Sequence, residues 1–360
     1  MRGIHGFLLA AVLVLPALPG SAQVGEEGFF DARADEAAEQ MDRKRPSLWR
    51  RPRKDTPAEQ LAYAAEVLER GHRRAAAGQY RALVHQWHDR PEAVTAQFRY
   101  ARLLEEAGEL RKAFDEYQYL VQFFPGRFPY DEILERQFAI ANHMMRTRQL
   151  GLFFFGGFHT PERALTMFRR IVANAPSWEH AAEAQYRIGW IHEEKKQYED
   201  AVRAYGVVLH RYPKSAFVDL AGFRQVLCLQ ELAQRSPRDE LACRRALSAC
   251  SSYLARYAQD REHTQRAREV LAELKQRLGG MYYATALFYD RMGRAQAAVI
   301  AYKDFTLKFP NDDRIRRALR RIDALSAVAE KESTQRAASA EDAEAPYNDI
   351  EEEPIDADQT

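Results

Sequence analysis

Three side chains in the middle of the chain, Tyr186, Trp190 and Glu193, have the types and the spacing of a peptide-binding surface. They lie four and three residues apart, so they share one face of a helix if this stretch is helical. Aromatic faces beside a charge suit an extended peptide that carries a terminal aromatic group or carboxylate. In the alternative interpretation, Tyr186 and Trp190 pack against a neighbouring helix and contact no ligand.

Catalytic motifs are missing from the sequence. His192 and Glu193 begin like a zinc-binding helix, but position 196 is a lysine, so the second histidine of that motif is absent. The chain has no Gly-x-Ser-x-Gly elbow and no glycine-rich loop of the kind that cradles phosphates. The formal net charge of +1 argues against a nucleic-acid-binding domain with a strong basic field. We therefore expect no enzymatic activity, no metal ion and no cofactor.

The elements that would position these side chains are two short helices within residues 182–213. Gly189 and Ala201 are small, and they lie where two helices would cross closely. Tyr205, four residues after Ala201, would fill the gap against the next helix, and Pro213 ends the unit. This spacing resembles the tetratricopeptide repeat (TPR), a pair of helices that stacks on copies of itself.

The same pattern recurs along the chain. The order Ala, then Phe or Tyr four residues later, then Pro after eight more, occurs at Ala113/Tyr117/Pro125, Ala164/Phe168/Pro176, Ala201/Tyr205/Pro213 and Ala298/Tyr302/Pro310. Phe (19) and Tyr (17) are a tenth of the 360 residues and Pro (15) is rarer, so chance predicts fewer than one match. Degenerate copies lie at Ala64/Ala76/Tyr80 and at Ala246/Cys250/Ala258. The sequence thus predicts an all-α TPR superhelical solenoid of about five to six helix pairs over residues 58–329.

Stacked helix pairs form a curved array whose concave groove is lined by the first helix of each pair. On the pattern of TPR grooves, the side chains expected to face outward from these helices are Phe98, Arg102, Tyr186, Trp190, Glu193 and Tyr283. These six residues are the candidate peptide- or partner-binding residues on helices.

The third repeat is interrupted by an apolar, glycine-containing loop at residues 150–161. Its aromatic residues Phe153, Phe154 and Phe155 are unusual for the surface of a soluble protein. Two interpretations stay open: the loop fills a gap between repeats, or it docks on a partner. The three phenylalanines are therefore also candidate partner-binding residues.

The two ends of the chain differ in composition from the helical region. Residues 1–22 have the basic start, short apolar run and small-residue exit of a secretory signal peptide, although a retained apolar helix is the alternative. Residues 23–57 read as a flexible basic linker, either a solvated tether or a weak contact for anionic lipid through Trp49. Residues 330–360 read as a disordered acidic tail.

The helical region, about residues 58–325, resembles the outer-membrane protein assembly factor BamD family of periplasmic TPR proteins. Three features carry the resemblance beyond the repeats. The chain has an export signal. The insert Phe153–Phe158 is followed by Glu162-Arg163-Ala164, like the aromatic-glycine insert of that family's third repeat. The last unit, residues 282–293 before Ala297-Ala298, is similar to the family's late helix.

The resemblance implies a non-enzymatic scaffold of the β-barrel assembly machinery at the periplasmic, inner face of the outer membrane. Its implied partners are the integral outer-membrane β-barrel assembly protein, the other assembly subunits and unfolded outer-membrane protein segments. Family members usually carry a lipid-bearing cysteine at the signal-peptide junction, whereas residues 20–23 contain none. We therefore expect membrane association through partners rather than a lipid anchor. The alternatives are a periplasmic TPR adaptor for envelope biogenesis or cell division and, in another class, an unrecognised helical enzyme.

Overall fold

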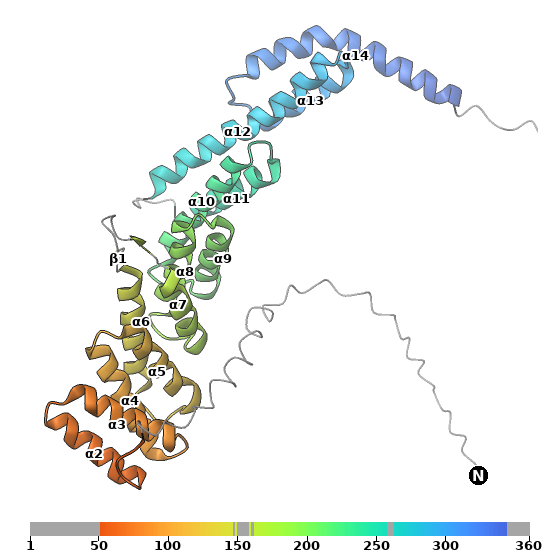
Figure 1. The fold of residues 1–360 in the computed structure, drawn as a ribbon. Coiled ribbons are helices and arrows are strands. Elements are labelled where there is room, and N and C mark those ends of the chain that lie inside the picture. Colours follow the sequence, from red (N-terminus) through yellow and green to blue (C-terminus); the bar gives the residue numbers. More distant parts are fainter. Residues whose placement is uncertain (1–50, 147, 150–157, 160–161, 258–262, 344–360) are drawn as a thin grey trace, which may run out of the picture. The chain divides into compact units, whose positions relative to one another are not determined.

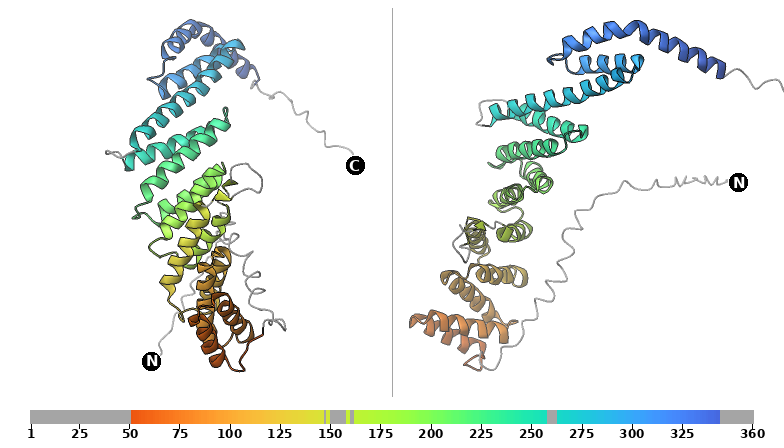
Figure 2. Two further views of the ribbon diagram at one scale, coloured as in Figure 1. Left: turned by 60° about the vertical axis from the view of Figure 1, so that its left-hand side comes forward. Right: turned by 45° about the horizontal axis from the view of Figure 1, so that its top comes forward.

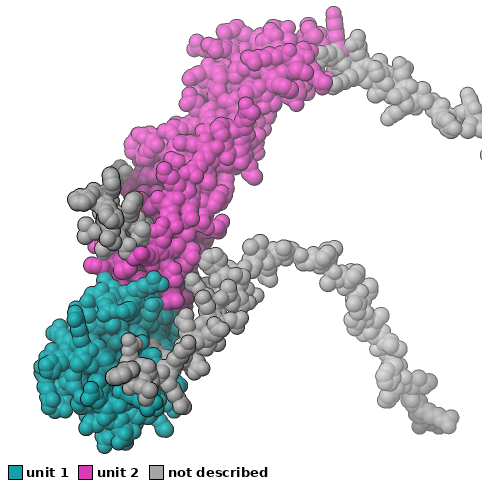
Figure 3. Space-filling view, viewed as in Figure 1, with its two compact units in different colours: residues 1–130 teal, residues 131–360 magenta. Residues whose placement is uncertain are grey.

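The structure is a computed structural model that describes residues 51–146, 148–149, 158–159, 162–257 and 263–343. The chain divides into two compact units, residues 1–130 and 131–360 (Figure 3). The helical region, expected as one array from residue 58 to residue 329, is thus divided after Tyr130. Regular structure in the described ranges is helical apart from one short pair of strands, so the all-α prediction is confirmed.

In its described residues, the first unit contains four helices that pack in chain order (Figure 1): α2 (Pro57–Glu69), α3 (Arg73–Gln86), α4 (Pro91–Glu106) and α5 (Leu110–Phe123). Thr56 caps α2 by accepting a hydrogen bond of 3.3 Å from the backbone N–H of Glu59. Proline opens both α2 and α4, where its missing N–H costs no helical hydrogen bond. Gly71 and Gly108 have φ angles of 83° and 75° in the turns that follow α2 and α4, a region that favours glycine.

The second unit contains the remaining described elements, in which successive helices from α7 onward pack side by side (Figure 2). They are α6 (Tyr130–Arg146), β1 (Arg148–Gln149), β2 (Phe158–His159), α7 (Glu162–Asn174), α8 (Ala181–Glu194), α9 (Tyr198–Arg211), α10 (Val218–Arg235), α11 (Glu240–Arg256), α12 (Thr264–Arg291), α13 (Ala295–Lys308) and α14 (Ile315–Ala343). The ring of Phe138 on α6 meets Phe168 of α7 edge-on, with centroids 5.9 Å apart. The described helices therefore form six pairs, α2/α3 to α12/α13, followed by α14.

The repeated alanine and the residue four positions later lie at the centre of every pair. All twelve side chains are at most 2% exposed: Ala76, Tyr80, Ala113, Tyr117, Ala164, Phe168, Ala201, Tyr205, Ala246, Cys250, Ala298 and Tyr302. The degenerate pairs at residues 76/80 and 246/250 are buried as completely as the four that match the pattern in full. The repeat pattern read from the sequence is therefore the pattern of the core.

The close helix crossing expected at Gly189 is confirmed. A Cβ atom added to Gly189 would lie 2.6 Å from two ring carbons of Tyr205, closer than real Cβ contacts come. The bare backbone of α8 thus allows the large Tyr205 ring of α9 to lie flat against it. Burial of that ring contributes roughly 2 kcal/mol or more of hydrophobic stabilisation, and any side chain at position 189 would displace it.

Helix α12 contains two consecutive glycines, which disfavour a helix interior. Gly279 and Gly280 nevertheless both lie inside this single 28-residue helix. Added Cβ atoms would meet Asp312 Oδ2 at 2.6 Å and Arg314 Nη1 at 2.9 Å. The glycines therefore let the connection between α13 and α14 pack against the α12 backbone. The first half of α12 packs on α11 and its second half pairs with α13.

Two further boundaries are set by the structure. Arg148 pairs with His159 and Gln149 with Phe158 in an antiparallel β1–β2 ladder, although the sequence shows almost no strand signal. This ladder brackets residues 150–157, which lie outside the described residues. Helix α14 ends at Ala343, beyond the boundary drawn from the sequence at residues 329/330. Residues 1–50 and 344–360 also lie outside the described residues.

Candidate protein-interaction site

Tyr186, the first of the candidate residues on α8, belongs to the core of the second unit. Its side chain is 5% exposed, and its ring lies 5.6 Å from the ring of Tyr205 and 5.5 Å from that of Phe217. Burial raises the pKa of the Tyr186 phenol, and the nearby positive charge of Arg224 opposes that shift. The structure therefore places Tyr186 behind the surface, where it supports its neighbours.

Glu193 lies one helical turn after Trp190 and is held by two fixed partners. Its carboxylate accepts a hydrogen bond of 2.7 Å from the Tyr205 hydroxyl and lies 3.0 Å from Nη1 of Arg224. The Glu193 side chain is 16% exposed. Burial first, and the Glu193 charge second, raise the pKa of Tyr205, which therefore stays protonated and donates. The cluster joins α8, α9 and α10.

The same cluster recurs in the last helix pair. The Tyr302 hydroxyl donates to Asp290 Oδ2 at 3.1 Å, and Arg321 of α14 binds both oxygens of Asp290 at 2.7 Å. Hydrogen bonds from Arg321 hold the pKa of Asp290 below its usual range. Each acid precedes its tyrosine by twelve residues, and each arginine follows it by nineteen. The two clusters are therefore a repeated device that connects a helix pair to the helix after it.

The spacing of this acid–tyrosine–arginine cluster is present in the sequence, but it was recognised only from the contacts in the structure. The first unit contains the same acid and tyrosine, because Tyr117 donates a hydrogen bond of 2.7 Å to Glu105 Oε2. In the sequence, an arginine also follows Tyr117 by nineteen residues, at position 136. A search for an acid, a tyrosine twelve residues later and an arginine nineteen after that would have found all three sets.

Five of the candidate residues are partly exposed and lie on first helices of pairs: Phe98 and Arg102 on α4, Trp190 and Glu193 on α8 and Tyr283 on α12. The ring of Phe98 lies 6.2 Å from that of Tyr117 and thus rests on the core of the first unit. Arg102 follows Phe98 by one helical turn, so a charge and an aromatic face lie on one side of α4. These candidate side chains keep part of their surface exposed, although Tyr205 and Arg224 already bind the Glu193 carboxylate.

Tyr283 lies against the core of the last pair, edge-on to Phe305 at 5.3 Å and to Tyr302 at 5.8 Å. The guanidinium of Arg314 lies 5.8 Å from the centre of the Tyr283 ring, within cation–π range. The adjacent Tyr282 points to a different set of partners. The structure thus brings an aromatic ring and a positive charge together at Tyr283.

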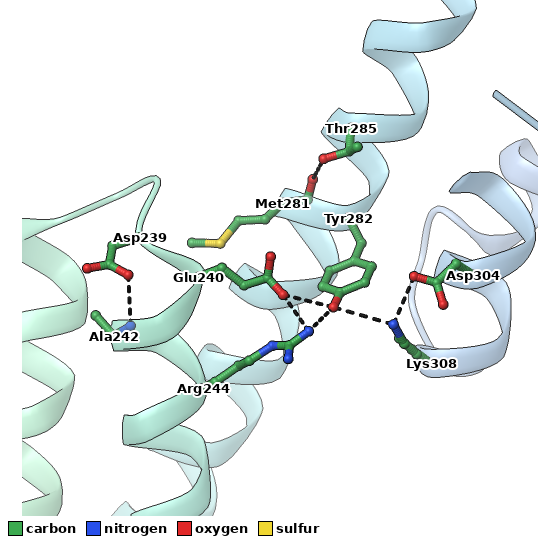
Figure 4. Close-up of polar contacts among 9 residues, drawn as sticks. All are labelled: Asp239, Glu240, Ala242, Arg244, Met281, Tyr282, Thr285, Asp304 and Lys308. Atoms are coloured by element: carbon green, nitrogen blue, oxygen red, sulfur yellow. Dashed lines mark hydrogen bonds and ion pairs between the residues drawn. The ribbon is translucent and has the colours of Figure 1, made fainter. Parts of the chain in front are cut away.

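Tyr282 is the centre of a polar network that sequence analysis did not single out (Figure 4). Its hydroxyl donates to Glu240 Oε1 at 2.8 Å and accepts from Arg244, which also pairs with Glu240 at 2.5 Å. On the other side, Lys308 Nζ lies 3.5 Å from the same hydroxyl and 2.9 Å from Asp304. The network links α11, α12 and α13 two residues after Gly280, so it fixes the fifth pair to the sixth.

The candidate residues Phe153, Phe154 and Phe155 lie outside the described residues, between β1 and β2. Among the described residues, no group of three or more His, Cys, Asp or Glu side chains is placed to hold a metal ion. None of the helices in the described part of the chain combines the length and apolar content that a membrane span requires. The described residues present partly exposed aromatic and charged side chains on stacked helices. Stacked helical repeats of this kind use such surfaces to bind other proteins.

Comparison with known families agrees with this description. The family model YfiO, described as an outer membrane lipoprotein, matches residues 159–340, and a tetratricopeptide repeat model matches residues 63–128. Both matches identify protein-interaction scaffolds, and the first is the BamD-like family that the sequence resembles. No curated protein matches the chain.

Several solved structures are similar to the chain at low identity. A tetratricopeptide repeat protein from Parabacteroides merdae is 15% identical, with 74% of this chain and 98% of that chain covered and a TM-score of 0.28. The apo form of RapI is 16% identical, with 74% and 99% covered and a TM-score of 0.30. The C-terminal part of a TPR protein from Cytophaga hutchinsonii is 14% identical, with 72% and 99% covered and a TM-score of 0.22.

Proposed function

Because the chain belongs to the YfiO family of outer membrane lipoproteins, whose model covers half of it, we propose that it is a scaffold of the β-barrel assembly machinery. In this role it binds the integral barrel component and receives segments of unfolded outer-membrane proteins. It performs no catalysis of its own. The single observation that carries the proposal is the family match over residues 159–340, which begins just after the aromatic insert Phe153–Phe158 and covers the helices from α7 into α14.

We place the protein in the periplasm, at the inner face of the outer membrane, where its partner subunits hold it. A scaffold in this place needs a rigid surface, because ordering a mobile surface on binding lowers affinity. The Glu193–Tyr205–Arg224 and Asp290–Tyr302–Arg321 clusters supply that rigidity, since each connects three successive helices. The buried Tyr186 supports the surface from behind, and Glu193 holds it in place.

In this proposal, the candidate residues whose side chains remain partly exposed make the contacts with a partner. Trp190 lies between Tyr186 and Glu193 on α8, so its ring is presented by a helix that both neighbours fix. Phe98 and Arg102 give the first unit a similar pairing of an aromatic face with a charge. Aromatic and arginine side chains are the residue types that most often dominate binding energy at protein interfaces.

The proposal is tested by affinity purification of the exported protein from its own cell envelope in a mild detergent, followed by mass spectrometry. We expect recovery of an integral β-barrel protein with its periplasmic assembly domains. A Trp190→Ala variant in the same experiment reports whether α8 takes part. Recovery of only soluble cell-wall or cell-division proteins would contradict the assembly role and favour a periplasmic adaptor.

A further inference from the structure

Helix α14 carries a basic surface that the proposed function does not use. Its inner face packs through Ala318, Ile322 and Ala329 into the core of the last pair. Its outer face, near the start of the helix, presents three exposed arginines, Arg316, Arg317 and Arg320, which we call the basic face. Within the described residues none of the three forms an ion pair, whereas their neighbour Arg321 binds Asp290.

The basic face works against the stability of its own helix. Arg316 and Arg320 lie four residues apart, as do Arg317 and Arg321, and like charges at this spacing repel each other on a helix surface. Asp313 and Asp323 are the nearest acids in the sequence, and neither comes within ion-pair distance of the three arginines in the described structure. The described residues therefore supply no acidic partner for the three arginines of the basic face.

The chain itself contains the complementary charge. Residues 344–360, which follow α14 directly and lie outside the described residues, contain seven acids and no lysine or arginine. The acids are Glu344, Asp349, Glu351, Glu352, Glu353, Asp356 and Asp358. Carboxylates are the natural partners of arginine, whose planar guanidinium can bind both carboxylate oxygens at once.

The segment is also long enough to reach the basic face. Arg320 lies 23 residues before Ala343, the end of α14, which is roughly 35 Å along a helix at about 1.5 Å per residue. The 17 residues from 344 to 360 span at most about 60 Å when extended. A segment tethered this closely meets the surface at an effective concentration on the order of millimolar, so individually weak ion pairs are sufficient.

We propose that residues 344–360 fold back onto the basic face of α14 and act as an internal competitor for acidic partners. Because exposed ion pairs are individually weak and are screened by salt, docking depends on several of them acting together. An acidic segment of a partner gains access to Arg316, Arg317 and Arg320 by displacing the tail. The basic face is thus an anion-binding surface with its own built-in occupant.

The test uses the full chain with fluorophores on cysteines introduced by A327C, one turn beyond Asp323, and T360C at the end of the tail. We expect high energy transfer at about 0.01 M ionic strength and a clear loss at about 1 M, where the Debye length falls from about 30 Å to about 3 Å. The R316Q/R317Q/R320Q variant should show the low value already at low salt. An E351Q/E352Q/E353Q variant should move in the same direction.

The matched control is R163Q/R211Q/R238Q, which removes the same charge from three exposed arginines elsewhere in the second unit. It should keep the transfer efficiency of the unsubstituted chain. The docking is wrong if R316Q/R317Q/R320Q shows the same transfer efficiency as the unsubstituted chain. It is also wrong if the control variant loses as much transfer as the α14 variant, or if the transfer efficiency does not change with salt concentration. The substituted positions within the described residues are exposed, and circular dichroism verifies that the helices are intact.

The competitor role has its own readout. A chain that ends at Ala343 should bind a poly-glutamate peptide severalfold more tightly than the full chain, and R316Q/R317Q/R320Q should abolish that gain. Equal affinity of the two chains would show that the tail does not compete for this surface. None of these measurements involves the barrel component, so they can fail while the scaffold function stands.

Discussion

The carboxylate of Glu193 on α8 lies 3.0 Å from the guanidinium of Arg224 on α10, although 31 residues separate them in the chain. The same carboxylate accepts a hydrogen bond from the hydroxyl of Tyr205 on α9. One side chain thus connects a helix pair internally and attaches it to the next pair. Asp290 does the same for α12, α13 and α14.

We predict that Arg224→Ala destabilises the second unit by roughly 1–3 kcal/mol, because it leaves the mostly buried Glu193 carboxylate without its charged partner. The matched control is Arg245→Ala. Arg245 pairs with Glu199 at 3.1 Å, but both side chains are about half exposed, so its loss should cost less than about 1 kcal/mol. Urea denaturation of both variants measures the difference. Equal losses would mean that the Glu193–Arg224 pair is no more than a surface ion pair.

The second prediction concerns His192, which is 6% exposed. Its Nε2 lies 3.1 Å from Arg169, which can only donate, so Nε2 accepts and the ring proton sits on Nδ1, 2.9 Å from Gln197 Oε1. Burial lowers the pKa of His192. The unfolded chain therefore binds this proton more readily, and the free energy of unfolding should fall as pH drops below about 6.5.

This pH dependence is measured by urea denaturation at pH 7.5 and 5.5. The fall in unfolding free energy should be smaller in His192→Gln than in the unsubstituted chain, whatever the substitution costs at pH 7.5. His210→Gln, which changes an exposed histidine at the end of α9, should keep the full pH dependence. The prediction fails if His192→Gln shows the same slope as the unsubstituted chain.

The third prediction follows from the close approach of Gly189 to Tyr205. Glycine to alanine inside a helix normally gains about 1 kcal/mol of helix propensity. At position 189 the new Cβ would lie 2.6 Å from the Tyr205 ring, so overpacking should reverse the sign and cost about 1–3 kcal/mol net. Gly78→Ala in α3 is the matched control, because nothing lies within 4 Å of its added Cβ.

Hydrogen exchange read by mass spectrometry separates the two glycine sites, which lie in different units. Amides of α8 and α9 should exchange faster in Gly189→Ala, and amides of α3 should exchange at the same rate or more slowly in Gly78→Ala. Protection of α8 in Gly189→Ala equal to that of the unsubstituted chain would show that Tyr205 can move aside at no cost.

The fourth prediction concerns partner binding by α8. Trp190→Ala should reduce capture of the barrel component at least about tenfold, the scale of an interface hot spot of about 1.4 kcal/mol or more. The helical circular dichroism signal should survive, because Trp190 is partly exposed. Trp190→Phe, which keeps an aromatic face, should recover much of the binding. Undiminished capture by a folded Trp190→Ala would remove this residue from the site.

The fifth prediction distinguishes the two roles left open for the aromatic insert. Deleting Phe153 to Phe155 should uncouple a partner, with an unchanged melting temperature, if these rings dock outside the fold. The antiparallel pairing of β1 with β2 already closes the base of the insert, so the deletion shortens a bracketed segment. A drop in melting temperature of several degrees, with partner capture retained by the folded fraction, would show that the rings fill a gap between repeats.

Much of the fold was determined by the sequence alone. The alanine and the residue four positions later identify the helix pairs, because a small residue and a large one must alternate where helices cross closely. Gly189 and Tyr205 show the rule in its plainest form, and the structure places them in direct contact. Even Cys250, where the aromatic residue is missing, is buried at the expected position. Periodicity is local information, and local information is sufficient to place these helices.

Other features were decided only by the tertiary structure. The repeat pattern predicts that Glu193, on the first helix of its pair, faces outward to a partner, but Arg224 of the next pair binds its carboxylate at 3.0 Å. Gly279 and Gly280 break helices by propensity, yet they sit inside α12 because Asp312 and Arg314 need bare backbone to approach. In both cases the deciding contact joins residues more than thirty positions apart. Helical periodicity reports which face of a helix is buried, but it carries no information about which distant side chain meets that face.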